Sequence, residues 1–77
     1  MELVAKRGFR ASVAKAGYSL RSLAEETGLA RESVCRAANG RPVRAGTAKK
    51  ICAALGVEFD DLFLVVEDHD GEVNAKQ

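Results

Sequence analysis

A predicted helix over residues 30–39 carries four side chains that could form directional polar contacts from one side. These side chains are Arg31, Glu32, Cys35 and Arg36. At about 100° per residue, they fall on the side opposite Val34 and Ala37. A guanidinium can donate two hydrogen bonds to the O6 and N7 of guanine, and a carboxylate can accept one from the cytosine amino group. This side therefore has the chemistry to read base edges. The alternatives are a surface ion network of Arg31, Glu32 and Arg36, and a Glu32 that orients Arg36 rather than contacting DNA.

Glycines and apolar spacing predict the helices that position these side chains. The predicted helical segments are residues 3–16, 20–27, 30–39, 47–55 and 57–63, with no alternating strand pattern before residue 63. Ser19 is a suitable N-cap, and Gly28 can adopt the left-handed conformation that ends a helix. Gly8 lies inside the first segment, where it indicates either a close helix crossing or a later helix start.

The second and third segments have the spacing of two short helices that cross steeply. Ala24 is small where the helices approach, Gly28 permits a tight turn with positive φ, and Leu29 fills the space beneath that turn. Val34 and Ala37 lie three residues apart and form the inward side of the second helix. This is the plan of a helix-turn-helix. An ordinary helical hairpin explains the apolar spacing but does not explain the polar outward side.

Composition and charge narrow the class of partner. The chain has 77 residues, 47% of them hydrophobic, with three Phe, one Tyr and no Trp, which favours one small domain with an aliphatic core. Residues 1–56 contain 11 Lys and Arg against 4 acidic residues, a net charge of +7. Residues 57–77 contain 1 Lys against 7 acidic residues, a net charge of −6. A basic body favours a polyanion such as nucleic acid, because each neutralised phosphate releases counterions.

The run GYSLRSLAEETGLARESVCRAANGR, residues 17–41, resembles the second and third helices of the Cro-type, lambda-repressor-like (XRE) helix-turn-helix family. The run TAKKICAALGVEFDDLF, residues 47–63, resembles the closing pair of helices of that family. The resemblance covers about residues 9–63 and implies an all-α, five-helix DNA-binding domain with a short C-terminal extension as a candidate strand or hairpin. It implies a sequence-specific transcriptional regulator, a small phage or mobile-element repressor or Cro-like protein, that binds a palindromic operator in double-stranded DNA.

The resemblance also implies the DNA-contacting positions. Base-reading positions fall on Arg31, Glu32 and Arg36, with Cys35 facing the groove nearby. Phosphate-contacting positions fall on Ser19, Arg21, Ser33, Asn39, Arg41 and Arg44. Helix N-termini present amide hydrogens to phosphates, and loop arginines add positive charge. Contacts of both kinds position the protein on DNA but do not distinguish one base sequence from another.

Three alanines depart from the family pattern. Ala30 stands where a Ser or Thr N-cap is usual, a loss typically worth about 1 kcal/mol. Ala37 and Ala48 stand where larger aliphatic residues are usual, so other side chains must fill that space. The candidates to fill it are Phe9, Phe59 and the run at residues 62–66.

An acidic tail, residues 64–77, follows the DNA-binding unit at residues 1–63. Leu64 to Val66 favour a strand that either turns back at Asp70-Gly71 as a hairpin or pairs between subunits. We expect a homodimer, with an apolar interface made of Phe59, Leu62, Phe63, Leu64, Val65 and Val66. Two alternatives are that the tail covers the basic surface and weakens nonspecific DNA binding, or that it binds a partner protein, as in an antitoxin or controller protein.

Other classes of function have little support in the residues. His69 is the one histidine and lies among consecutive acids, which we interpret as a solvated charge run rather than a metal site. No Ser-His-Asp order and no phosphate-binding loop occur, so we expect neither an enzyme nor a cofactor. Cys35 and Cys52 lack CxxC spacing and are expected to be reduced thiols. With no run of about 20 apolar residues and no signal-peptide core, we expect no membrane contact and a cytoplasmic, nucleoid-associated protein.

Overall fold

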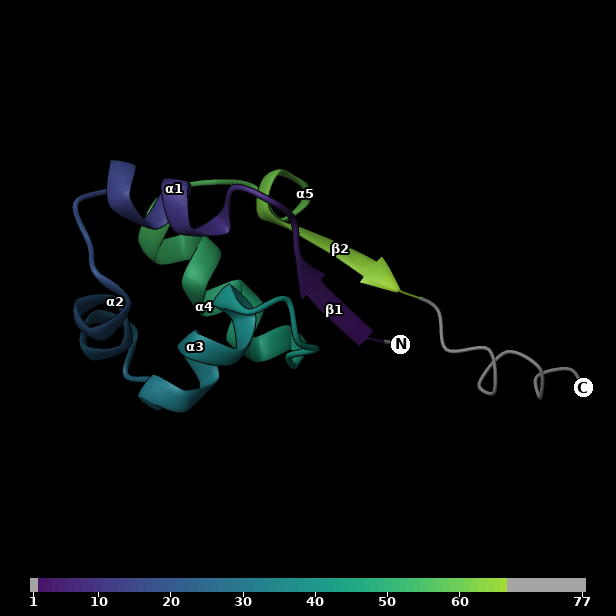
Figure 1. Cartoon of the computed structure of the whole chain (residues 1–77), viewed down its shortest axis with the longest axis horizontal. Coiled ribbons are helices and arrows are strands. Elements are labelled where there is room, and N and C mark those ends of the chain that lie inside the picture. Colours follow the sequence, from purple (N-terminus) through teal and green to yellow (C-terminus); the bar gives the residue numbers. More distant parts are fainter. Residues whose placement is uncertain (1, 67–77) are drawn as a thin grey trace, which may run out of the picture.

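Five short helices gather at one end of the molecule, and a two-stranded ribbon extends from them (Figure 1). The computed structural model describes residues 2–66. In chain order the elements are β1 (Glu2–Ala5), α1 (Phe9–Lys15), α2 (Leu20–Thr27), α3 (Arg31–Ala38), α4 (Ala45–Leu55), α5 (Phe59–Leu62) and β2 (Phe63–Val66). The predicted five-helix architecture with a C-terminal strand is confirmed, and α2 has the predicted bounds. Within the described range, every helix is too short or too polar to cross a lipid bilayer.

The N-terminal residues form a strand where the sequence predicted a helix. β1 pairs antiparallel with β2, and Leu3 lies opposite Val65. α1 begins only after Gly8, whose φ of 90° is a left-handed conformation that glycine adopts without strain. The prediction of one helix over residues 3–16 is therefore wrong for its first part, because the strand depends on a partner near the other end of the chain. The alternative of a late helix start is confirmed.

The ribbon has one side that meets the helices. Directly opposed residues share a side, so Leu3 and Ala5 of β1 lie on the same side as Val65 and Phe63 of β2. This side joins the core at Leu3 and Phe63, which are 4% and 0% exposed. The backbone N–H of Val43 donates to the carbonyl of Leu3 at 2.9 Å, so the loop between α3 and α4 bonds to the outer edge of β1.

One apolar core joins the helices to the ribbon. Its buried side chains are Leu3, Phe9, Val13, Leu23, Ala24, Val34, Ala37, Ala48, Ile51, Cys52, Leu62 and Phe63. The ring of Phe63 meets that of Phe9 edge-on, with 6.0 Å between centroids, and stacks on that of Phe59 at 5.8 Å. Phe9 and Phe63, two of the candidates to fill the space beside Ala37 and Ala48, therefore belong to the same core as these alanines.

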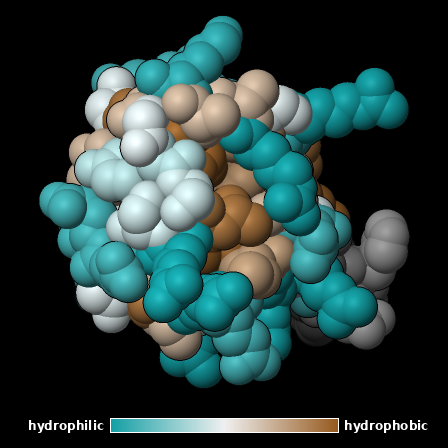
Figure 2. All heavy atoms as spheres, turned by 60° about the vertical axis from the view of Figure 1, so that its left-hand side comes forward, coloured by the Kyte–Doolittle hydropathy of each residue, from teal (hydrophilic) through white to brown (hydrophobic). Residues whose placement is uncertain are grey.

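The helical end of the molecule has a mainly hydrophilic surface. Figure 2 shows this end, where an apolar area lies among many charged and polar side chains. Among residues 2–66, the large apolar side chains that are exposed are Leu64, Val65 and Val66 of β2, at 41%, 43% and 39%. The exposed large apolar side chains of residues 2–66 therefore lie on the ribbon, whereas the helical end shows an apolar area surrounded by polar groups.

Candidate nucleic-acid interface

Two serines fix the start of α2. The Oγ of Ser19 accepts a hydrogen bond from the N–H of Ser22 at 3.0 Å, and the Oγ of Ser22 accepts one from the N–H of Ser19 at 2.8 Å. This reciprocal arrangement satisfies two backbone donors near the start of the helix. The predicted N-cap role of Ser19 is confirmed, and its position at the surface leaves it accessible.

Hydrogen bonds hold the turn between α2 and α3. Gly28 adopts a φ of 75°, and its N–H donates to the carbonyl of Ala24 at 2.9 Å, which also accepts from Leu29 at 3.1 Å. The hydroxyl of Thr27 donates to the carbonyl of Leu23 at 2.8 Å and accepts from the N–H of Leu29 at 3.3 Å. Thr27 is absent from the predicted set of residues, although a threonine just before a helix-ending glycine favours such a bond to the backbone. These bonds set the direction in which α3 leaves the turn.

α3 begins without a side-chain cap, as its alanine N-cap predicted. The carbonyl of Ala30 accepts from the N–H of Ser33 at 2.9 Å and from that of Val34 at 3.3 Å, so backbone bonds alone close the first turn. Val34 and Ala37 are both 0% exposed, which confirms the predicted inward side. The opposite side of the helix is consequently directed to solvent.

The predicted base-reading side chains come together on this solvent side of α3. Arg31, Glu32 and Arg36 are exposed, and Cys35 is half-buried. The Nη2 of Arg36 lies 4.0 Å from the Oε2 of Glu32, and the two side chains are 51% and 84% exposed. The ion pair weighed as an alternative is therefore present. Such an exposed pair is worth at most about 1 kcal/mol, so a more highly charged partner can displace it.

Four of the six predicted phosphate contacts border hollows that Arg36 also borders: Ser33, Asn39, Arg41 and Arg44. The six are the exposed Ser19, Arg21, Asn39, Arg41 and Arg44, and the half-buried Ser33. The Nε of Arg21 lies 3.9 Å from the Oε2 of Glu25. The Nη2 of Arg10 donates to the Oδ1 of Asn39 at 3.1 Å, so a residue of α1 contacts the end of α3. Arg10 is absent from the predicted set of residues because 29 positions separate it from Asn39, so no local spacing relates the two.

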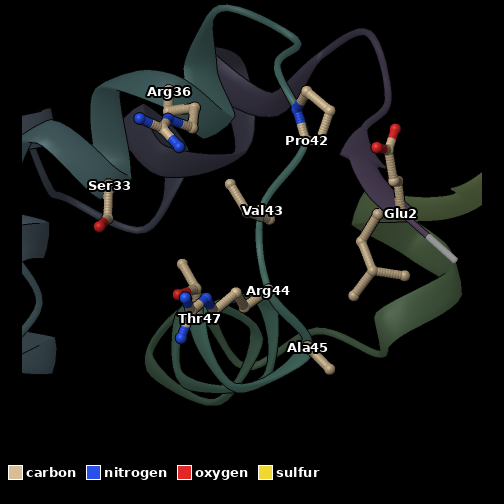
Figure 3. A pocket seen from close by; sticks show the side chains of 9 residues that line it. Glu2, Ser33, Arg36, Pro42, Val43, Arg44, Ala45 and Thr47 are labelled. Atoms are coloured by element: carbon tan, nitrogen blue, oxygen red, sulfur yellow. The ribbon is translucent and has the colours of Figure 1, made fainter.

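Two hollows border Arg36. The larger has a volume of about 340 Å³ and lies between α3, β1 and the start of α4. Figure 3 shows Arg36 and Arg44 on separate walls of this cleft, with Val43 between them and Glu2 toward β1. The smaller hollow, of about 210 Å³, is lined by Glu32, Cys35, Arg36, Asn39 and Arg41. Arg36 therefore borders both hollows, and each has a second arginine in its wall.

Two residues predicted for a dimer interface lie inside the protomer instead. Leu62 and Phe63 are 2% and 0% exposed, because their side chains complete the core of their own chain. Their assignment to a contact with a second subunit is therefore wrong. Phe59 is half-buried against Phe63. The exposed members of the predicted set are Leu64, Val65 and Val66.

Thiols and acidic residues form no metal or redox centre in the described part of the chain. Both cysteines are unpaired, and burial, helped by the charges of Asp61 and Glu58, raises the pKa of Cys52 above its ordinary value of 9.0. Within residues 2–66 no group of three or more His, Cys, Asp and Glu side chains could hold a metal ion. Residues 67–77, with His69 and the predicted hairpin turn, lie outside the described residues, so what the sequence predicted of them stays a prediction.

Comparison with known proteins identifies the arrangement. Residues 10–68 match the sequence model of the Cro/C1-type HTH DNA-binding domain, a span that runs from α1 to beyond β2. Neither the curated proteins nor the solved structures yield a match. On the family match, the chain belongs to the Cro/C1-type helix-turn-helix DNA-binding domain family.

Proposed function

We propose that the protein is a sequence-specific transcriptional regulator that binds a palindromic operator in double-stranded DNA as a homodimer. The observation that carries this proposal is the joint exposure of Arg31, Glu32 and Arg36 on the second helix of a helix-turn-helix. The major groove is about 12 Å wide and admits one α-helix. Within it each arginine can pair with a guanine, and the glutamate can accept from a cytosine amino group.

The surrounding polar residues would position the helix on the duplex. We assign phosphate contacts to Ser19, Arg21, Ser33, Asn39, Arg41 and Arg44. Such contacts fix register and orientation without carrying sequence information. Because Arg10 donates to the Oδ1 of Asn39, we add Arg10 as a residue that positions this amide at the end of α3.

We assign the dimer contact to the open edge of β2. The opposite edge of the ribbon is already bonded to Val43. The N–H of Lys6 donates to the carbonyl of Leu62 at 2.8 Å, so these two residues form a hydrogen-bonded pair. Along two antiparallel strands such pairs alternate with pairs that are not hydrogen-bonded, and Val65 with Leu3 is of the second kind. The N–H and C=O of Val65 therefore point away from β1. A second copy of β2 can pair there about a two-fold axis that sets Val65 opposite Val65 of the second copy, with the exposed apolar side chains of the two strands beside one another on both faces. Such a dimer would present two copies of α3 to half-sites about one helical turn apart.

Occupation of a promoter by this dimer would repress transcription by excluding polymerase. The resemblance to small repressors and Cro proteins supports a phage or mobile-element regulator. We assign it no catalytic activity and place it in the cytoplasm, on the nucleoid.

Selection of bound fragments from a random duplex library tests the proposal. The purified protein is incubated with the library at near-physiological salt, and the bound duplexes are sequenced. We expect a palindrome with G·C pairs in each half-site and half-site centres about 10 base pairs apart. A folded protein that enriches no motif would contradict sequence-specific recognition.

A further inference from the structure

We propose that the acidic end of the chain, residues 67–77, binds in the cleft beside Arg36 and competes with DNA for it. This inference rests on the DNA-binding role proposed above and adds a regulation of the same surface. The end of the chain would act as an internal polyanion that nonspecific DNA must displace.

The cleft has the chemistry to hold carboxylates. Its volume is about 340 Å³, with Arg36 and Ser33 contributed by α3, and Arg44 and Thr47 contributed from the start of α4 (Figure 3). Arginine can bind a carboxylate through two parallel N–H···O bonds, and a hydroxyl can donate a further one. Val43 lies between the two groups of polar residues, so the cleft also has an apolar part against which a peptide backbone can lie.

The two arginines of the cleft are available for a new partner. Among residues 2–66, Arg44 forms no ion pair, and Arg36 forms one, with Glu32. That pair is 4.0 Å long and its side chains are 51% and 84% exposed, so it holds the guanidinium weakly.

The register of the ribbon places Val66, the residue before the acidic segment, across β1 from this cleft, at a distance of one strand. Val66, the last described residue, pairs with Glu2, and Glu2 lines the cleft. An extended chain covers about 3.3–3.6 Å per residue, so even the first few residues after Val66 suffice to reach across a hollow of this size. Because Glu2 is itself acidic, we expect the carboxylates to bind toward the arginines and away from β1.

Charge favours the same occupant. Residues 67–77 contain four acidic residues, Glu67, Asp68, Asp70 and Glu72, against one lysine, a net charge of −3, whereas residues 1–56 carry +7. A covalently attached segment acts at an effective concentration in the millimolar range, which favours this occupant over an acidic peptide of another molecule at lower concentration. If the cleft is occupied in about nine of ten molecules, the apparent affinity for DNA falls about tenfold.

A pair of full-length variants tests the proposal. In the first, Asp68→Asn and Asp70→Asn remove two charges from the acidic segment. In the second, Glu26→Gln and Asp60→Asn remove two charges from exposed sites on α2 and α5 whose carboxylates form no ion pair within residues 2–66. The two variants have equal net charge, so any difference between them separates a local contact from a general electrostatic effect.

The first measurement is made on the protein without DNA. In two-dimensional amide NMR spectra, we expect Ser33, Arg44 and Thr47 to shift in the first variant but not in the second, and the difference to vanish at about 0.5 M salt because screening dissociates the contact. Cleft amides that do not respond to the first variant would overturn the proposal. A difference between the two variants at these amides that grows with protein concentration would also overturn it, because dimerisation through β2 is common to both variants and the segment would then come from another molecule.

The second measurement is the affinity for a duplex of random sequence. We expect the first variant to bind about three- to tenfold more tightly than the control variant, because more molecules have an open cleft. Equal affinities for the two variants would overturn the competition. If neither variant binds DNA but the cleft amides still respond, residues 67–77 do bind in the cleft and the proposed DNA-binding function is wrong. Failure of the further inference can therefore be told apart from failure of the proposed function.

Discussion

Replacing Arg36 with alanine should weaken binding to the selected operator and relax the preference at one base pair. The guanidinium is exposed on the solvent side of α3, where it can pair with the O6 and N7 of a guanine. A bidentate pair of this kind discriminates by about 1–3 kcal/mol. With a tenfold change for each 1.4 kcal/mol, the affinity for the operator should fall about 5- to 150-fold.

The same substitution should leave the stability of the fold nearly unchanged. In the described part of the chain, the one ion pair of Arg36 is the exposed contact with Glu32 at 4.0 Å, and an i,i+4 pair of this kind is worth about 0.3–0.5 kcal/mol. Alanine is also a good helix former. Thermal unfolding of the variant should therefore differ little from that of the wild type, which makes the loss of affinity attributable to the contact with DNA.

Fluorescence anisotropy gives the measurement, with the selected duplex and a scrambled duplex of equal length. Arg21→Ala is the matched control, because Arg21 is also exposed and pairs with a glutamate four positions on, at 3.9 Å. We expect Arg21→Ala to weaken both duplexes alike and Arg36→Ala to weaken mainly the selected one. An equal loss on both duplexes for Arg36→Ala would refute its role in reading bases.

Three further predictions address the loop, the ribbon and the core. Arg44→Ala should weaken binding to all sequences similarly and reduce the salt slope of the affinity by about 1, and a loss confined to the operator would contradict a phosphate contact. In a Cys35→Ser background, Val65→Cys should form an intersubunit disulfide, because the Cα atoms of the two paired residues 65 would lie about 5.5 Å apart, which suits such a bond. Leu64→Cys, on the other side of the strand, should form none. Equal cross-linking of the two variants would exclude a pairing centred on Val65. Burial, with nearby acidic charge, raises the pKa of Cys52 above 9.0, so the native state keeps this proton to higher pH than the unfolded state does. The free energy of unfolding should therefore fall as pH rises above about 9, and urea titrations should show a smaller fall for Cys52→Ala.

Short-range sequence signals located the helix-turn-helix correctly. The bounds of α2, the cap at Ser19, the positive φ at Gly28 and the inward side at Val34 and Ala37 all follow from residues within a few positions of one another. Capping, turn conformation and helical periodicity are local properties, so a single sequence determines them. The same locality explains why the solvent side of α3 could be identified from residues 31–36.

Contacts between distant residues decided the remainder. β1 exists because Leu3 pairs opposite Val65, and Phe63 is a core residue rather than an interface residue because its ring packs against Phe9. Likewise, the cleft beside Arg36 forms only where β1, α3 and α4 converge. The sequence by itself therefore determined the helices and the candidate DNA-reading side chains. Only the tertiary structure decided the strand, the buried face of the ribbon and the cleft, because each depends on contacts between residues that are far apart in the chain.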